Sequence, residues 1–138
     1  MRLLTGVLLL ALCGSWAVAV DVISTYAGDG SIGFSDDDSD AISSALHNPG
    51  GVSLNSLGNL LISDTYNNRI RLVTTLGIIT TIAGSGATGA TSGSFGGDGG
   101  NASSAGLNNP STVEIDSSGI DYTCKFMHSQ CTFTLLSS

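Results

Sequence analysis

The strongest constraint on this 138-residue chain is that parts of it occur twice. The segment Ile23–Gly30 returns as Ile79–Gly86, 56 residues later. The segment Leu46–Val52 returns as Leu107–Val113, at an offset of 61 residues. A difference in loop length explains the change of offset, because surface loops tolerate insertions while the elements they join do not. The chain is therefore built from copies of one small unit, and each unit can bury its apolar surface only against a neighbour.

The most complete copy is Asn48–Gly86, and its pattern predicts four short strands with turns between them. The expected strands are Val52–Leu54, Leu60–Ser63, Arg69–Val73 and Ile78–Ile82. In the third strand, Ile70 and Leu72 alternate with the two arginines, so that apolar and charged side chains take opposite faces. The chain also has 19 glycines and only 11% charged residues, which favours an all-β protein rich in turns. A period near 60 residues with about four strands predicts a blade of a β-propeller.

The flanking segments predict strands of two further blades. Ile23–Ala27 is expected to be an outer strand of the kind that closes a propeller ring by joining the last blade. Asn109–Ile115 is expected to be the inner strand of the next blade. Propellers typically have four to eight blades. The sequence therefore predicts a propeller fragment with one complete four-stranded blade plus flanking strands.

Within the central copy, Leu46–Gly84 resembles an NHL repeat. The resemblance rests on the segments Asn48-Pro49, Gly51-Val52, Asn55–Asn59, Ile62–Thr65, Asn67–Ile70 and Gly77–Ile79. With the partial copies on each side it extends over Ile23–Gly119. It implies a β-propeller that binds a protein or another ligand, with enzymes as a minority. One departure from the family pattern is Ser35–Asp40, an acidic segment in place of a glycine-rich connection.

The N-terminus has the features of a secretory signal peptide. Arg2 supplies a short positive region, Leu3–Leu12 an apolar segment, and Ala17–Ala19 a cleavage site with small residues. We therefore expect a signal helix at residues 1–19, a mature chain that starts near Val20, and a secreted protein. If the signal is not cleaved, the same segment would anchor the chain to a membrane.

The remaining chain divides into a propeller region at residues 20–119 and a tail at residues 120–138. After Gly119 the repeat pattern stops, and the tail contains Cys124 and Cys131. One hypothesis is that the sequence is truncated or changes reading frame at this point. The alternative is a small complete protein whose tail forms a disulfide-closed hairpin with a strand at Cys131–Leu135. His128 lies between the two cysteines, but three ligands are too few for a structural zinc site.

One acidic cluster is a weak candidate for a calcium site. Asp36, Asp38 and Asp40 have the alternate spacing of a calcium-binding loop. Ala41 stands where the loop needs a glycine for its sharp turn, and His47 stands where a bidentate glutamate is required. A solvated loop is therefore the preferred interpretation, and no cofactor is predicted.

The other candidate residues lie at turns. Asn101 begins a glycosylation sequon in a segment rich in glycine and serine. Tyr66 lies at the tip of the Thr65–Asn68 turn and is a candidate binding residue. The flanking Asp64 and Arg69 are expected to form turn hydrogen bonds or an exposed pair of little energetic value. The turn residue His47 has no partner base in the sequence pattern, so no catalytic residue is predicted.

These patterns favour a secreted, non-enzymatic NHL-repeat protein that binds a protein or carbohydrate ligand. Two alternatives are a fragment of a propeller enzyme of the lyase or lactonase type that lacks its active site, and a non-functional product. The net charge of −7 argues against nucleic acids and anionic membrane surfaces as partners. Self-association through open sheet edges is also expected.

Overall fold

The structure is a computed structural model. It describes residues 23–86, 96–97, 99–115, 121–127 and 130–136, the last two segments by their backbone alone. The predicted signal peptide at residues 1–19 lies outside the described residues. In the described part of the chain, no helix is long and apolar enough to span a membrane.

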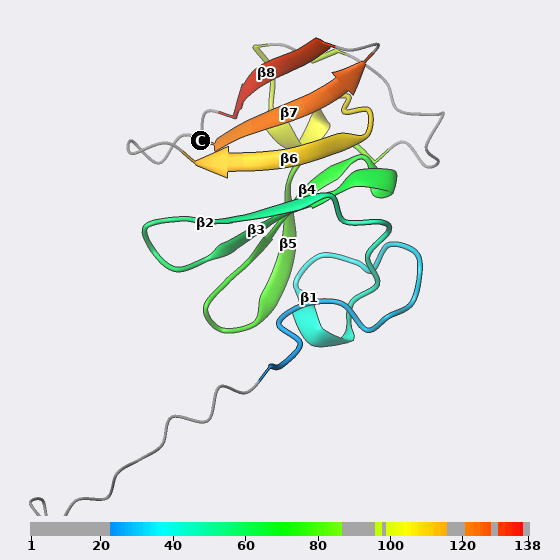
Figure 1. The fold of residues 1–138 in the computed structure, drawn as a ribbon, viewed down its shortest axis with the longest axis vertical. Coiled ribbons are helices and arrows are strands. Elements are labelled where there is room, and N and C mark those ends of the chain that lie inside the picture. The colour runs from blue at the N-terminus through cyan, green and yellow to red at the C-terminus, as the bar shows by residue number, and fades with distance from the viewer. Residues whose placement is uncertain (1–22, 87–95, 98, 116–120, 128–129, 137–138) are drawn as a thin grey trace, which may run out of the picture.

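Two antiparallel sheets make up the fold (Figure 1). The first has the order β1-β5-β4-β3-β2 and contains β1 (Ser39–Asp40), β2 (Gly51–Leu54), β3 (Leu60–Asp64), β4 (Arg69–Val73) and β5 (Ile78–Ala83). The second has the order β6-β7-β8 and contains β6 (Pro110–Ile115), β7 (Asp121–Met127) and β8 (Gln130–Leu136). Single 3₁₀ turns are η1 (Ala41–Ser43), η2 (Thr65–Asn67) and η3 (Ala102–Ser104). The four strands of the blade and the first strand of the next unit are therefore confirmed.

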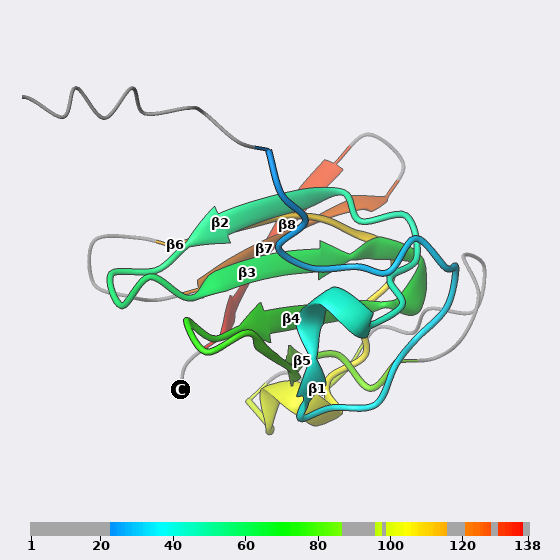
Figure 2. The ribbon, with the colours of Figure 1, turned by 90° about the horizontal axis from the view of Figure 1, so that it is seen from below.

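The first sheet is covered on both faces (Figure 2). On one face the second sheet packs against it, with a buried cluster that consists of Leu61, Ile70, Ala83, Leu107 and Val113. On the other face lies a cluster that consists of Ala41, Ile62, Val73 and Ile79, with Ala27, Leu46 and Leu60 packed against it. Successive side chains of these strands point to opposite faces of the sheet and so contribute to two apolar cores. One core lies between the two sheets, and the other lies beneath the segment that precedes β2.

The expected outer strand at Ile23–Ala27 is wrong. Residues 23–25 have no regular structure, and Ile23 is fully exposed. The amides of Gly28 and Asp29 donate to the carbonyls of Ala41 and Ser44, so the segment is held at η1. The outer edge of β5 is instead paired with β1. An outer strand needs a ladder partner, and no described residue offers one to Ile23–Ala27.

The tail forms a hairpin that extends the second sheet. The predicted strand Cys131–Leu135 lies within β8, which confirms it. The register places Cys124 opposite Phe133 and Cys131 opposite Phe126, so the two cysteines are not cross-strand partners. Their disulfide stays a prediction.

Gly84 lies against the backbone of a neighbouring turn, and its substitution should destabilise the protein. It has a φ of 95°, and a Cβ at this position would overlap the carbonyl oxygen of Asn68. Gly77 has a similar φ of 80°, but a Cβ there would meet nothing within 4 Å. We expect Gly84→Ala to lower the free energy of unfolding by about 3 kcal/mol, from left-handed strain plus overpacking. Gly77→Ala should cost only about 1 kcal/mol, from the strain alone.

Urea denaturation of both variants checks this expectation. Equal losses at the two positions would contradict the close approach of the Gly84 and Asn68 backbones.

Candidate functional site

The turn between β3 and β4 is the part of the blade with the highest density of buried polar groups. Asp64 ends β3, Thr65–Asn67 form η2, and Asn68 closes the turn in the left-handed region with a φ of 53°. The amide of Asn68 donates to the carbonyl of Thr65. Asparagine tolerates this conformation better than most residues, so the turn needs no glycine here.

Asp64 organises the buried side of this turn. Its side chain is completely buried. Oδ1 accepts a hydrogen bond from the amide of His47 at 2.8 Å, and Oδ2 accepts one from Asn67 Nδ2 at 2.7 Å. Asn67 Nδ2 also donates to the carbonyl of Gly33 at 2.6 Å. Asp64 and Asn67 together tie the turn to two segments that precede the blade, at His47 and at Gly33.

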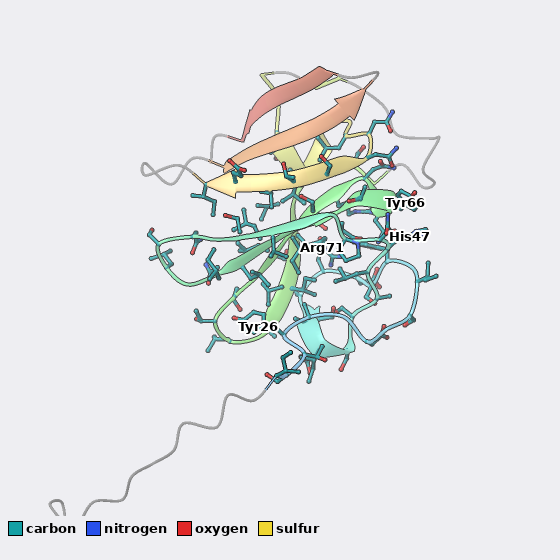
Figure 3. The ribbon with its side chains drawn as sticks, viewed as in Figure 1. Tyr26, His47, Tyr66 and Arg71 are labelled. Carbon is teal, nitrogen blue, oxygen red and sulfur yellow. The ribbon has the colours of Figure 1, made fainter. Side chains whose placement is uncertain are left out.

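Arg71 is the second buried charge, and it is also completely buried (Figure 3). Its Nη2 donates to the carbonyl of Ser35 at 3.1 Å and to Asp37 Oδ1 at 3.3 Å. Its Nη1 lies 3.7 Å from Asp64 Oδ2. The Nε and Nη1 atoms make no hydrogen bond, so the guanidinium is only partly satisfied.

The expected exposed pair of Asp64 and Arg69 is therefore wrong. Asp64 and Arg69 are cross-strand neighbours in the backbone register, but the ion pair that Asp64 forms is with Arg71. Arg71 follows Arg69 by two residues and so shares its face of the sheet. The expectation of turn hydrogen bonds is confirmed for Asp64, which accepts them from His47 and Asn67.

Burial shifts the pKa of both charged groups towards the neutral form. Desolvation raises the pKa of Asp64 above 3.8, against the opposing effects of Asn67, His47 and the nearby arginines. Desolvation also lowers the pKa of Arg71, while Asp37 and Asp64 oppose the shift. An ion pair in this position constrains geometry more than it adds stability, since both charges lose their hydration.

The same turn also joins the two sheets. Thr65 Oγ1 donates to the carbonyl of Pro110 at 2.8 Å, and the amide of Asn109 donates to Asn68 Oδ1 at 2.7 Å. Gly50 lies in this contact, where a Cβ would come within 2.6 Å of the carbonyl oxygen of Ser111. The polar residues of the turn thus connect the blade to the first strand of the next unit.

Two aromatic residues stand on the outer side of the turn. Tyr66 is 36% exposed, and its amide donates to the carbonyl of His47. The two rings meet edge to face with their centroids 5.1 Å apart. Figure 3 shows them together, away from Tyr26, which is 50% exposed. Tyr66 therefore lies at the accessible tip where the sequence places it.

The three calcium candidates are not brought together as ligands. Asp40 caps η1 by accepting from the amide of Ile42, and Asp38 takes a left-handed conformation with a φ of 62°. Among the described residues there is no group of three or more His, Cys, Asp or Glu that could hold a metal ion. The neighbour Asp37 has a structural role that the sequence did not reveal, since it contacts Arg71 and Thr81.

Asn101 is exposed at the start of η3. Its Oδ1 accepts hydrogen bonds from the amide and the hydroxyl of Ser103, the third residue of the sequon. Glycosylation at this position stays a prediction.

The raised pKa of Asp64 predicts an unusual dependence of stability on pH. Between 3.8 and the folded-state pKa, the folded chain binds more protons than the unfolded chain. The stability supplied by the protonated carboxyl is fully present below 3.8 and is lost as the pH rises through the folded-state pKa. In Asp64→Asn this contribution is absent.

We therefore expect the stability of the wild type, relative to Asp64→Asn, to rise on acidification towards pH 3.8 by up to about 1.4 kcal/mol per pH unit. Urea denaturation at several pH values from 3.8 upwards measures the difference in the free energy of unfolding between the wild type and Asp64→Asn. Asp36→Asn, at an exposed position, is the matched control. If the stability of the wild type relative to Asp64→Asn instead increases as the pH rises, the ion pair with Arg71 outweighs the desolvation of Asp64.

Comparison with known proteins identifies the central unit. The family model of the NHL repeat matches residues 46–71. No curated protein matches the chain. Among solved structures, a structural genomics protein of unknown function from Bacteroides thetaiotaomicron superposes with a TM-score of 0.60 and 20% identity, over 74% of this chain and 24% of that one.

An auxiliary nutrient binding protein from the same organism superposes with a TM-score of 0.51 and 20% identity, over 71% of this chain and 25% of that one. The chain thus spans about a quarter of the length of each of these structures. At this level of identity the likeness shows the fold alone.

Proposed function

The chain carries an NHL repeat, and from this premise we propose that it is a secreted, non-enzymatic module of the β-propeller type that binds a protein or carbohydrate ligand through its loops. Secretion rests on the predicted signal peptide at residues 1–19. The auxiliary nutrient binding protein that shares the fold is, by its name, a binding protein. That name supports the general class and says nothing of the ligand.

The observation that carries the proposal is that the polar residues of the repeat's turn are buried and contact other parts of the same chain. Asp64, Asn67 and Arg71 are buried, and each makes contacts within the chain. Their contacts hold loops and a neighbouring sheet in place, so they build a scaffold. Function on such a scaffold resides in the exposed loop residues.

Tyr66 is the exposed residue best placed for binding. Its backbone is fixed by the turn and by the hydrogen bond to His47, and its ring is braced against the His47 ring. An aromatic side chain held in this way loses little conformational entropy when a ligand covers it. Rigid aromatic residues dominate the energetics of many binding surfaces.

Binding of the full secreted chain to arrays of carbohydrates and of extracellular proteins tests the proposal. For any ligand retained by the wild type, Tyr66→Ala should weaken binding at least about tenfold, which corresponds to about 1.4 kcal/mol. Tyr26→Ala is the matched control, because Tyr26 is also exposed but lies elsewhere on the surface. Its affinity should equal that of the wild type.

Equal binding by Tyr66→Ala and the wild type would contradict the assignment of this loop. Turnover of an array ligand by the wild type would contradict the non-enzymatic role.

A further inference from the structure

We propose that the blade inserts the tips of two turns, the β2–β3 turn (residues 55–59) and the β4–β5 turn (residues 74–77), into the surface of a neutral lipid bilayer. The contact belongs to the mature chain and does not need the predicted signal peptide. It goes beyond the proposed function, because these turns lie at the end of an antiparallel sheet opposite to the β3–β4 turn, where Tyr66 lies.

The two turns have the same geometry and expose the same kind of side chain. In each turn the carbonyl of the first residue accepts a hydrogen bond from the amide three residues later. That residue is a glycine with a φ of 80°, Gly58 in one turn and Gly77 in the other. The residue before each glycine is a leucine. Leu57 is 76% exposed and Leu76 is 87% exposed.

The turns lie side by side at one end of the blade (Figures 1 and 2). The amide of Thr75 donates to Asn59 Oδ1 at 3.2 Å, which links one turn to the other. A Cβ on Gly58 would lie 3.4 Å from Cγ2 of Thr75. Both leucines are therefore carried by the same end of the sheet, on turns that support each other.

The geometry of the turn does not require an apolar residue at its tip. Residues 116–119 repeat the pattern of residues 55–58, and there Ser118 stands in the place of Leu57. Leu54, which precedes the β2–β3 turn, is also 64% exposed. Single exposed leucines are common on proteins, but three that are grouped at one end of a sheet indicate a surface that contacts an apolar partner.

The backbone of both turns is hydrogen-bonded internally, as insertion into lipid requires. Asn55 Oδ1 accepts from the amides of Leu57 and Asn59, and Thr74 Oγ1 accepts from the amide of Ile78. The amides of Asn55 and Thr74 donate across the ends of their own turns. These bonds take the place of the hydrogen bonds to water that the turns would lose among lipid chains.

The charge distribution selects a neutral lipid surface. Residues 48–63 and 72–86, which include both turns, contain no Asp, Glu, Lys or Arg. No ionised group of these stretches therefore has to lose its hydration on insertion. Glu114 on β6 is exposed, and the whole chain has a net charge of −7. An anionic bilayer would repel such a chain, whereas a zwitterionic one would not.

The size of the surface favours a bilayer over a second copy of the chain. The two turns comprise five and four residues. A stable protein interface takes about 20–30 residues from each partner. A bilayer has no such requirement, because burial of protruding leucines among its lipid chains is favourable by the hydrophobic effect alone.

Co-sedimentation of the full secreted chain with phosphatidylcholine vesicles tests the inference. We expect reversible binding with a partition constant on the order of 10³–10⁴ M⁻¹, at or below that of a single myristoyl chain. Leu57→Ser and Leu76→Ser should each weaken binding about tenfold, since each removes one buried leucine. The double variant should not bind at millimolar lipid.

Ile32→Ser is the matched control. Ile32 is also an exposed apolar loop residue, at 79%, but it precedes Gly33, whose carbonyl accepts from Asn67 at the opposite turn. This variant should bind as the wild type does. All three substituted positions are exposed, so each variant should fold, and urea denaturation checks this.

A nuclear magnetic resonance measurement on the wild type needs no variant. Spin-labelled phosphatidylcholine in the vesicles should broaden the amide resonances of Leu57 and Leu76 before that of Tyr66. Vesicles that contain phosphatidylserine should bind the chain more weakly than phosphatidylcholine alone.

Three results would overturn the inference: no binding at lipid concentrations on the order of 10 mM, equal binding by the wild type and the double variant, or stronger binding to the anionic vesicles. A dimer that the double variant loses, without binding to vesicles, would assign the turns to a second copy and also overturn it. None of these results bears on the array ligands of Tyr66, so the proposed function is tested separately.

Discussion

The burial of two opposite charges, Asp64 and Arg71, is the constraint from which the arrangement of the surrounding loops follows. Two charges without hydration are costly, and they persist only where the surrounding structure supplies hydrogen bonds. Here the amide of His47 and the side chain of Asn67 donate hydrogen bonds to Asp64, while the carbonyl of Ser35 accepts one from Arg71. Segments without regular structure are therefore fixed relative to the sheet by the need to satisfy these groups.

The same turn determines how the sheets stack. Thr65 donates to the carbonyl of Pro110, and Asn68 accepts from the amide of Asn109, so that β6 is held at the end of the blade where the ion pair lies. The apolar cluster between the sheets supplies the stacking energy, and these directional bonds select one alignment. The polar residues that are most typical of the repeat thus have structural roles, and the proposed function assigns ligand binding to exposed residues such as Tyr66.

Much of this fold follows from the sequence because strand periodicity and turn residues are local signals. The four strands of the blade, β6 and the strand within β8 were all predictable from alternation and turn chemistry. The burial of Arg71 was not, because alternation assigns a residue to a face and cannot show whether solvent or a polar loop covers that face. Ile23–Ala27 resembled a strand, but a strand also needs a partner, which local sequence does not specify.

Native-state hydrogen exchange tests most directly whether the hydrogen bonds of the polar turn between β3 and β4 break only when the blade unfolds. The amides of His47 and Asn109 donate to buried side-chain oxygens of the turn. They should exchange as slowly as the amide of Leu72 in β4, because they open only when the blade unfolds. The amide of Leu57, which donates to Asn55 Oδ1 on an exposed turn, should exchange much faster. Exchange of His47 and Asn109 at the rate of Leu57 would contradict the account.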